Sequence, residues 1–392
     1  MKYLLLFALS GLALACADDP SSAGSAGAGG SSSSGGSGQS GGAAGTAQAG
    51  AAGLSGSSGQ AGAPACDGHL AEGVAVKTGD VYRYAPYAVD GCQLLYLAPT
   101  PDGAELRLRD LVDGTEQTLA PASESPQRPS IAGPVAAWEA TADGRQVVRV
   151  RSGGETRTVT GSFAQATEPR ATVDAVVLTT WTSLDPGADT DIALLSVASG
   201  ALTPVFTGPG QQRFADVSPT HVAFTDFAED PDGVFNDNDS DIADVAVLDR
   251  GTGLLTLHKL PGKQAFAQLA GNGEVVYLNW PGEHPEPKLQ AYGVSVWTLA
   301  TSLDRSLGEV HTSVTDYGRP EARGGLAQWT IYPGGYSRLL RAVLADGLPG
   351  HEVGGLEGKT IYSPVSAGSF SLIATRPTGD VDSPPTLQVV PQ

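Results

Sequence analysis

The stretch DTDIALLSVASGALTPVF, residues 189–206, decides the fold because it holds two short apolar runs separated by a Ser-Gly turn. The stretch DSDIADVAVLDRGTGLLTL, residues 239–257, repeats this order: Asp-Ile, an apolar run, a Gly-containing turn and a second apolar run. Apolar runs this short, bounded by Gly, Asp and Pro, are typical of β-strands. We therefore expect each stretch to form the third and fourth strands of one repeated unit.

A further apolar run precedes each of these stretches and recurs along the chain. Its seven copies are LLYLA at 94, VAAWEA at 135, VVLTTW at 176, VAFTDF at 222, VVYLNW at 275, LAQWTI at 326 and LIATR at 372. Successive copies begin 41 to 53 residues apart, and a four-stranded unit of about 40–50 residues is the period of a propeller blade. The sequence predicts an all-β, seven-bladed β-propeller over residues 66–392, with six blades as the alternative.

Two further segments complete the predicted unit. A small turn-containing segment comes before the recurring run, as in RPSIAG at 128 and EPRATVD at 168. The last unit lacks a fourth strand, whereas GVAVKT, residues 73–78, forms a spare strand before the first unit. We expect this spare strand to complete the last blade and close the ring, because closure removes unpaired sheet edges.

The segments at 189–206 and 239–257 resemble the repeats of TolB-like β-propellers, which carry Asp-Ile-Tyr-hydrophobic-Asp-x-x-x-Gly. By motif the resemblance covers two blades, and by period it covers most of residues 70–392. It implies the propeller fold. It does not imply a role in the Tol machinery, because the chain lacks the α/β domain that precedes the propeller in TolB.

The N-terminus is typical of an exported lipoprotein. Lys2 is followed by an apolar run, residues 3–14, that is too short to span a bilayer. The sequence before Cys16 resembles a bacterial lipobox, although Ala13 and Leu14 depart from its usual order. We predict a signal peptide over residues 1–15 and lipidation of Cys16, which would anchor the chain in a membrane; ordinary signal cleavage near Cys16 is the alternative.

Residues 16–65 are dominated by Gly, Ser and Ala after the cysteine. Such a tract has too little apolar surface to fold, and about 50 residues of it have a reach of roughly 40 Å. The absence of Asp after Cys16 resembles the sorting rule for outer-membrane lipoproteins. We expect an outer-membrane lipoprotein of the cell envelope that faces the periplasm or the cell surface.

Charge and cysteine content restrict the partners and the compartment. The formal net charge of −19 argues against nucleic acid, which binds basic surfaces. Besides Cys16, only Cys66 and Cys92 are present. In an oxidising envelope these two could form a disulfide that fixes the end of the linker to the first strands, or they could remain two separate thiols.

Residues 226–244, DFAEDPDGVFNDNDSDIAD, form the most acidic stretch of the chain. Asp230, Asp232, Asn236 and Asp239 fall at alternating or loop-closing positions that could supply oxygen ligands to calcium. The loop lacks a ligand at its first position and has no flanking helices, so the alternative is a solvated loop between two strands. Calcium is the one cofactor that the sequence suggests.

Other candidate residues suggest packing rather than chemistry. Four tryptophans end or nearly end the recurring strand: Trp138, Trp181, Trp280 and Trp329. Bulky residues on such a strand can fill the space between blades or, on a rim, stack on sugars. The six histidines show no metal-ligand spacing. The only Gly-x-Ser-x-Gly motif, residues 38–42, lies in the linker, so no catalytic residue is predicted.

Together these patterns predict a monomeric, membrane-tethered propeller that acts as a binding scaffold for an envelope protein or an extracellular polymer. The alternative is a polysaccharide-acting propeller enzyme such as a lyase, because some propeller lyases resemble TolB-like repeats. Those lyases use a metal and clustered His, Arg and Gln near the central channel. A purely structural envelope protein is a third possibility.

Overall fold

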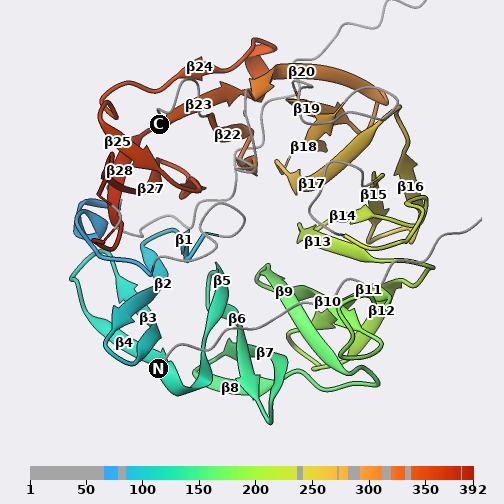
Figure 1. The fold of residues 1–392 in the computed structure, drawn as a ribbon, viewed down its shortest axis with the longest axis horizontal. Helices are drawn as coiled ribbons and strands as arrows, with labels where there is room; N and C mark the ends of the chain where they lie inside the picture. The colour runs from blue at the N-terminus through green and yellow to red at the C-terminus, as the bar shows by residue number, and fades with distance from the viewer. Residues whose placement is uncertain are drawn as a thin grey trace, which may run out of the picture. The chain divides into compact units, whose positions relative to one another are not determined.

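The computed structural model describes residues 66–77, 85–235, 242–271, 273–280, 292–310, 319–331, 337–380 and 382–392. The predicted signal peptide, Cys16 and the linker lie outside these residues. The described residues form seven four-stranded antiparallel sheets around a central axis (Figure 1). The predicted seven-bladed propeller is confirmed, and the six-bladed alternative is wrong.

Each of the first six blades takes its four strands in chain order, with the first strand nearest the axis (Figure 1). Blades 1 and 2 are β1 Tyr87–Asp90, β2 Gln93–Thr100, β3 Gly103–Asp110, β4 Glu116–Ala120, then β5 Gln127–Ala132, β6 Val135–Ala142, β7 Arg145–Ser152, β8 Glu155–Thr158. Blades 3 and 4 are β9 Gln165–Ala171, β10 Ala175–Trp181, β11 Thr190–Ser196, β12 Leu202–Phe206, then β13 Gln212–Val217, β14 His221–Asp226, β15 Asp244–Asp249, β16 Leu255–His258. Blades 5 and 6 are β17 Lys263–Leu269, β18 Glu274–Trp280, β19 Tyr292–Thr298, β20 Leu303–Val310, then β21 Glu321–Arg323, β22 Leu326–Ile331, β23 Arg338–Val343, β24 His351–Glu352.

Blade 7 has a divided inner strand. Its strands are β25 Lys359–Ile361, β26 Val365–Ser366, β27 Phe370–Pro377 and β28 Thr386–Pro391. Both β25 and β26 pair with β27, and β28 pairs with the other edge of β27. Among the described residues, three short 3-10 helices lie outside the sheets: η1 His69–Ala71, η2 Ala122–Glu124 and η5 Leu344–Asp346. In the described part of the chain, no helix has the length and apolar character needed to cross a membrane.

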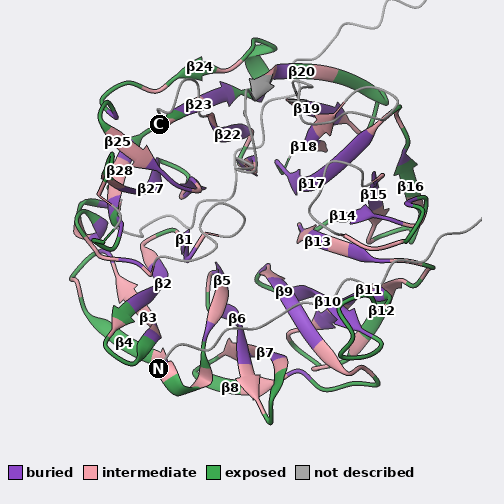
Figure 2. Ribbon diagram, in the orientation of Figure 1, coloured by how far each residue is buried: buried purple, intermediate pink, exposed green. Residues whose placement is uncertain are grey.

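The hydrophobic core is divided into clusters that lie between neighbouring blades. Along β2, Leu94 and Tyr96 pack with blade 7, whereas Leu95 and Leu97 pack with blade 2. Because side chains alternate across a strand, each blade buries both of its faces against two neighbours. Exposed residues are confined largely to the outer strands and the loops (Figure 2). No blade could bury its two apolar faces alone.

The spare N-terminal strand closes the ring. Ala75 forms an antiparallel bridge with Thr386 of β28, and the Leu387 N–H donates to the Val74 carbonyl at 2.8 Å. Behind this segment, a Cβ at Gly68 would lie 2.6 Å from the Phe370 ring, so only glycine fits there. The structure thus confirms that residues 73–76 complete the last blade; residue 78 lies outside the described residues.

The segments expected to contain turns prove to be inner strands with a bulge. In β5, β9, β13 and β17, two residues lie opposite a single residue of the partner strand, which is a β-bulge. The bulged residue has a left-handed backbone in every case: Arg128 (φ 47°), Glu168 (φ 57°), Phe214 (φ 59°) and Phe266 (φ 62°). A non-glycine residue in this conformation costs roughly 1–3 kcal/mol, so neighbouring structure must hold it in place.

Side chains of the preceding blade supply that support. The Glu168 N–H donates to the Glu139 carboxylate at 2.5 Å, and the Phe214 N–H donates to the Glu168 carboxylate at 2.9 Å. The Phe266 N–H donates to the Thr225 hydroxyl at 3.0 Å. Three successive blade junctions are therefore joined by the same backbone position near the axis.

Two further carboxylates stand near the axis, Asp216 of β13 and Glu321 of β21. The Asp216 carboxylate accepts a hydrogen bond from the Leu269 N–H at 2.8 Å, which joins blades 4 and 5. Burial raises the pKa of Asp216 and raises that of Glu321 to about 7; Arg170 and Arg323 oppose the latter shift. Glu321 is therefore partly protonated in the folded protein at neutral pH.

The raised pKa of Glu321 predicts how stability depends on pH. The unfolded chain ionises this group near its ordinary pKa, so the folded state binds the extra proton and loses stability as pH rises from about 4.5 to 7. We expect Glu321→Gln to match the wild type near pH 4.5 and to exceed its free energy of unfolding by about 3 kcal/mol at pH 8. Urea unfolding at both pH values measures this difference, and parallel pH profiles for the two proteins would contradict it.

The structure brings Cys66 and Cys92 together. The two side chains share a hydrogen bond, and burial with this contact raises the pKa of Cys92 to about 12. Cys92 lies in the turn between β1 and β2, whereas the Cys66 carbonyl accepts a hydrogen bond from Ser369 of blade 7 at 3.3 Å. A disulfide here would tie the closing segment to blade 1, but its formation stays a prediction.

We expect oxidation to join Cys66 to Cys92 and to stabilise the ring by about 3 kcal/mol, because the bond closes a loop of roughly 27 residues. Peptide mapping without reductant detects the bond, and thermal melting with and without reductant measures its effect. The Cys66→Ser variant should melt like the reduced wild type under both conditions. Alkylation of both thiols in the oxidised protein would show that the bond does not form.

Candidate functional site

The acidic stretch 226–244 is only partly described. Asn236 and Asp239, two of the four predicted calcium ligands, lie outside the described residues. The Asp230 carboxylate accepts hydrogen bonds from the Ile242 N–H at 2.8 Å and the Asp232 N–H at 3.3 Å. The Asp232 carboxylate in turn accepts from the Val234 N–H at 2.9 Å.

Both described acids of the predicted calcium site therefore hold the loop's own backbone. Among the described residues, no group of three or more His, Cys, Asp or Glu side chains could hold a metal ion. Calcium binding at this loop stays a prediction.

The tryptophans lie mostly between blades, as one of the two sequence interpretations expects. Trp138 and Trp329 are fully buried in the clusters between blades 1 and 2 and between blades 5 and 6. Trp181 is buried and donates its Nε1–H to the Thr167 hydroxyl at 2.9 Å. Trp280 is half-buried and its ring lies 5.2 Å from the Lys263 ammonium, so it is the most exposed of these four tryptophans.

His258 shows the structural role of a buried histidine here. Its ring stacks on Trp297 with centroids 4.3 Å apart, and its Nε2 lies 3.0 Å from the Asp304 carboxylate. Tyr277 donates to the same carboxylate at 2.7 Å. This cluster links the outer strand of blade 4 to blade 5 and leaves the ring of His258 well partnered.

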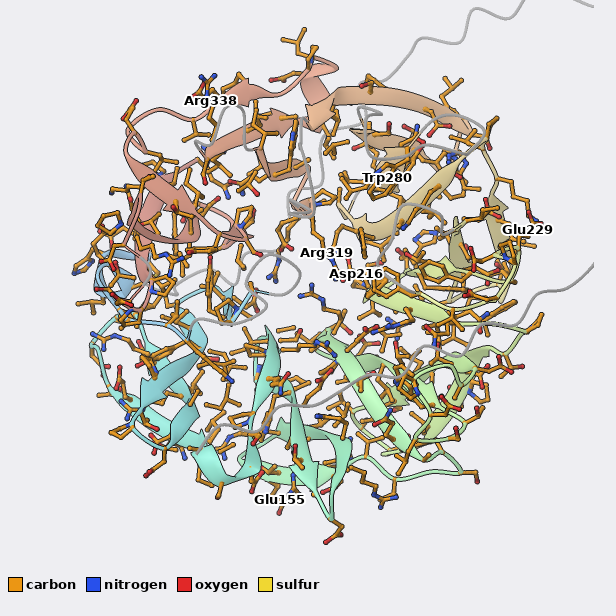
Figure 3. The ribbon with its side chains drawn as sticks, in the orientation of Figure 1. Glu155, Asp216, Glu229, Trp280, Arg319 and Arg338 are labelled. Carbon is orange, nitrogen blue, oxygen red and sulfur yellow. The ribbon has the colours of Figure 1, made fainter. Side chains whose placement is uncertain are left out.

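A narrow pocket at the axis is the site that the sequence did not predict. It is lined by residues of β5, β9, β13 and β17 together with two residues outside the strands: Ala85, Arg128, Pro129, Glu168, Pro169, Arg170, Phe214, Ala215, Phe266, Gln268 and Arg319. Figure 3 shows Arg319 and Asp216 near the middle of the ring. The volume of the pocket that water can enter is about 20 Å³, which is room for one or two water molecules.

The inner-strand bulges determine what lines the pocket. Arg128, Glu168, Phe214 and Phe266 are the four bulged residues, and all four contribute to its wall. In β5 and β9 a proline follows the bulged residue, and a bulge tolerates proline because its backbone need not donate to the ladder. The same irregularity that joins the blades thus places charged and aromatic side chains at the axis.

Two of the arginines near the axis have close acidic partners. Arg128 donates to the Glu139 carboxylate at 2.7 Å, and Arg213 donates to Glu168 at 2.5 Å. Glu168 also accepts from the Thr179 hydroxyl at 3.1 Å. These contacts compensate the charges of both glutamates and fix their orientation.

Arg319 and Arg170 are held differently. The Arg319 guanidinium carbon lies 3.9 Å from the centre of the Phe266 ring and 4.3 Å from that of Phe214, which are cation–π contacts. Arg170 interacts electrostatically with Asp216 and Glu321. The pocket is therefore a basic site, built by several blades, in a protein of net charge −19.

The sequence gives little signal for this pocket. Arg170 and Arg319 are far apart in the chain, and neither belongs to a recognisable motif. Only the recurrence of the strand that precedes each copy of the apolar run could have indicated which residues meet at the axis. That recurrence is visible in RPSIAG at 128 and EPRATVD at 168. Each begins with the bulged residue, Arg128 or Glu168, and a proline follows it.

Comparison with known proteins supports the fold. No protein-family model matches the chain, and no curated protein matches it. The structure is similar to the β-propeller domain of the Trilobed protease from Pyrococcus furiosus, with 10% identity and a TM-score of 0.58 over 78% of this chain and 93% of that one. It is also similar to an oligogalacturonate lyase in complex with manganese, with 13% identity and a TM-score of 0.51 over 76% of this chain and 86% of that one.

TolB from Acinetobacter baumannii also aligns, with 13% identity over 65% of this chain and 61% of that one. Its TM-score of 0.43 is too low to carry an argument. At these identities the likenesses show the fold alone, and that fold occurs in both a peptidase and a lyase. The chain is an all-β, seven-bladed β-propeller.

Proposed function

We propose that the chain is an exported lipoprotein, anchored in the outer membrane through Cys16, whose propeller is a binding scaffold for an envelope protein or an extracellular polymer. The sequence of residues 1–65 supports the anchor and the linker, and the propeller fold supports the binding role. A closed ring with bonded blade junctions is a rigid support, and rigid supports lose little entropy when they bind.

One observation carries the binding role: guanidinium groups from several blades line a single pocket at the axis. In an acidic protein, a local basic site attracts the acidic groups of a partner. The acidic remainder of the surface repels the same groups, so contact is favoured at the basic site. Recognition would therefore take place at the axis, and the partner would meet the inner strands or the loops beside them.

The polysaccharide lyase is the alternative. The similarity to a lyase propeller extends to the fold, and it assigns no reaction to this chain. Among the described residues, His69, His221, His258 and His351 lie on separate elements, and none lines the axial pocket. His284 and His311 lie outside the described residues. The enzyme hypothesis has no supporting observation among the described residues, and the binding hypothesis has one.

Membrane anchoring can be tested by cell fractionation. We expect Cys16→Ala to move the protein from the membrane fraction to the soluble fraction, because the acyl chains on Cys16 would be its membrane attachment. Cys66→Ala is the matched control and should stay with the membrane. Equal recovery of the two variants in the membrane fraction would contradict the anchor.

Binding can be tested by cross-linking the tagged full chain to its surroundings in the source cells and recovering the adducts. We expect one saturable envelope component that untagged full chain displaces. Digestion of the recovered material with a protease then separates a protein partner from a polymer. If recovery is linear with concentration and untagged chain does not compete, the propeller has no specific partner and the proposal is wrong.

A further inference from the structure

A second, larger hollow lies away from the axis, between the closing segment 73–76 and the outer strands of blade 1. Its polar wall is formed by Tyr96 of β2, Arg107 and Arg109 of β3 and Glu116 of β4. It shares no lining residue with the axial pocket. The volume that water can enter is about 270 Å³, which is large enough for one sugar ring. We call this hollow the closing groove.

The alternation of β3 places both arginines on the same side of blade 1. In the order Glu105-Leu106-Arg107-Leu108-Arg109, the charged residues point to one face of the sheet and the leucines to the other. The two leucines pack in the cluster between blades 1 and 2. The charged face therefore turns toward the closing segment.

The charges at the closing groove are paired with one another. Arg107 donates through Nε and Nη2 to the Glu105 carboxylate at 3.2 and 3.0 Å. Arg109 donates through Nη1 to the Glu116 carboxylate at 2.6 Å. Two arginines thus stand against two glutamates, and these four charges cancel. A charged ligand would meet a like charge beside each opposite one, so the groove favours a neutral ligand.

One oxygen of Glu116 is left without a hydrogen bond. Its Oε1 accepts both from the Tyr96 hydroxyl at 2.8 Å and from Arg109 at 2.6 Å. Among the described residues, nothing donates to its Oε2, and Arg107 Nη1 lies 3.6 Å from it, beyond hydrogen-bond distance. The Tyr96 hydroxyl also interacts with Arg107, which helps to hold the guanidinium in place. An unused acceptor and a guanidinium nitrogen therefore lie side by side in the groove.

Adjacent hydroxyls of a sugar ring fit this arrangement. One hydroxyl can donate to Glu116 Oε2 while its neighbour accepts from Arg107 Nη1, and a bond to a charged group is stronger than a neutral one. A single peptide unit cannot supply the same pair, because its N–H and C=O lie on opposite sides of a trans bond. The apolar side chains of Val74 and Pro99 also line the groove and could contact the C–H groups of the ring.

We propose that the closing groove binds one neutral sugar unit, with Glu116 and Arg107 contacting two adjacent hydroxyls. This inference goes beyond the proposed function, because it adds a binding site apart from the axial pocket and names the class of its ligand. The sugar would lie against the segment that closes the ring. Since only the folded, closed ring presents this groove, binding also raises the stability of the ring.

The first experiment is ligand-observed NMR titration of the purified full chain with the methyl glycosides of glucose, galactose and mannose. We expect at least one of them to bind saturably, with a dissociation constant on the order of 1–10 mM for so small a ligand. The same glycoside with every hydroxyl O-methylated keeps the ring and loses the donors, so it is the matched probe and should not bind.

Two outcomes of this titration would overturn the inference. One is that none of the three glycosides saturates the protein by about 100 mM, a concentration well above the expected dissociation constant. The other is equal binding of the O-methylated form. N-acetylglycinamide, a neutral peptide unit, should not bind, and binding as tight as that of the best glycoside would overturn the assignment to sugars.

Three variants assign the response to the closing groove. Glu116→Ala removes the unused acceptor and should weaken binding of the glycoside by about tenfold or more. Glu116→Gln keeps an acceptor without its charge, so we expect an affinity between those of Glu116→Ala and the wild type. Glu352→Gln is the control, because Glu352 pairs at 3.1 Å with Arg338 at the periphery of the ring (Figure 3). It should bind like the wild type.

Thermal melting of each variant separates lost binding from lost folding. If Glu116→Ala does not fold, Glu116→Gln decides. Wild-type affinity in the folded Glu116→Ala protein, or in Glu116→Gln where it decides, would overturn the assignment to this groove.

Failure of this inference is separable from failure of the proposed function. Specific capture of an envelope component by a chain that binds none of the glycosides would overturn the sugar site alone. Binding of a glycoside without any captured component would support the sugar site and contradict the scaffold.

Discussion

The carboxylate of Glu168 is the interaction on which the arrangement of the ring depends most directly. Glu168 belongs to blade 3, yet it accepts the Phe214 N–H and an Arg213 guanidinium hydrogen from blade 4. A buried carboxylate without such partners would cost several kcal/mol, and with them it fixes the angle between two blades. Glu139 and Thr225 repeat this role at the junctions on either side. The apolar clusters supply the attraction between blades, and these directional bonds determine their register.

Closing the ring requires a second set of contacts, because the chain begins and ends beside each other in blade 7. Hydrogen bonds between residues 73–76 and β28 join the first segment to the last. At the axis, Arg323 of blade 6 reaches past the short β26 and donates to Asp90 of blade 1. Gln328 of blade 6 also donates to the Ser366 hydroxyl of blade 7 at 2.6 Å. The divided inner strand of blade 7 is thus compensated by side chains from its neighbours. Contacts of the closing segment and contacts near the axis both hold the first and last blades together, so we expect the ring to unfold as a unit.

How far the sequence determines this structure depends on the range of the interactions. The seven apolar runs and their Gly-rich turns predict the blades because alternation and turn chemistry are local properties. The role of the spare strand at 73–78 is predictable because the last blade lacks a fourth strand, and pairing the two removes an unpaired sheet edge. The bulges are not, since the residues that adopt the left-handed backbone in β13 and β17 are Phe214 and Phe266, and phenylalanine does not favour this conformation. Their conformation is imposed by acceptors on the preceding blade, which the local sequence does not contain.

The same reasoning explains why the local sequence does not predict the axial pocket, whereas it does indicate the acidic loop. A loop rich in Asp attracts attention because its residues are adjacent, but Asp230 and Asp232 bind their own backbone. Arg170 and Glu321 are 151 positions apart and become neighbours only when blades 3 and 6 face each other across the axis. In a ring of repeats, each blade contributes one or two inner-strand residues to the axis, and no single blade carries a recognisable motif. A charged set collected in this way from β9, β13 and β21 has a fixed geometry because the blades are fixed.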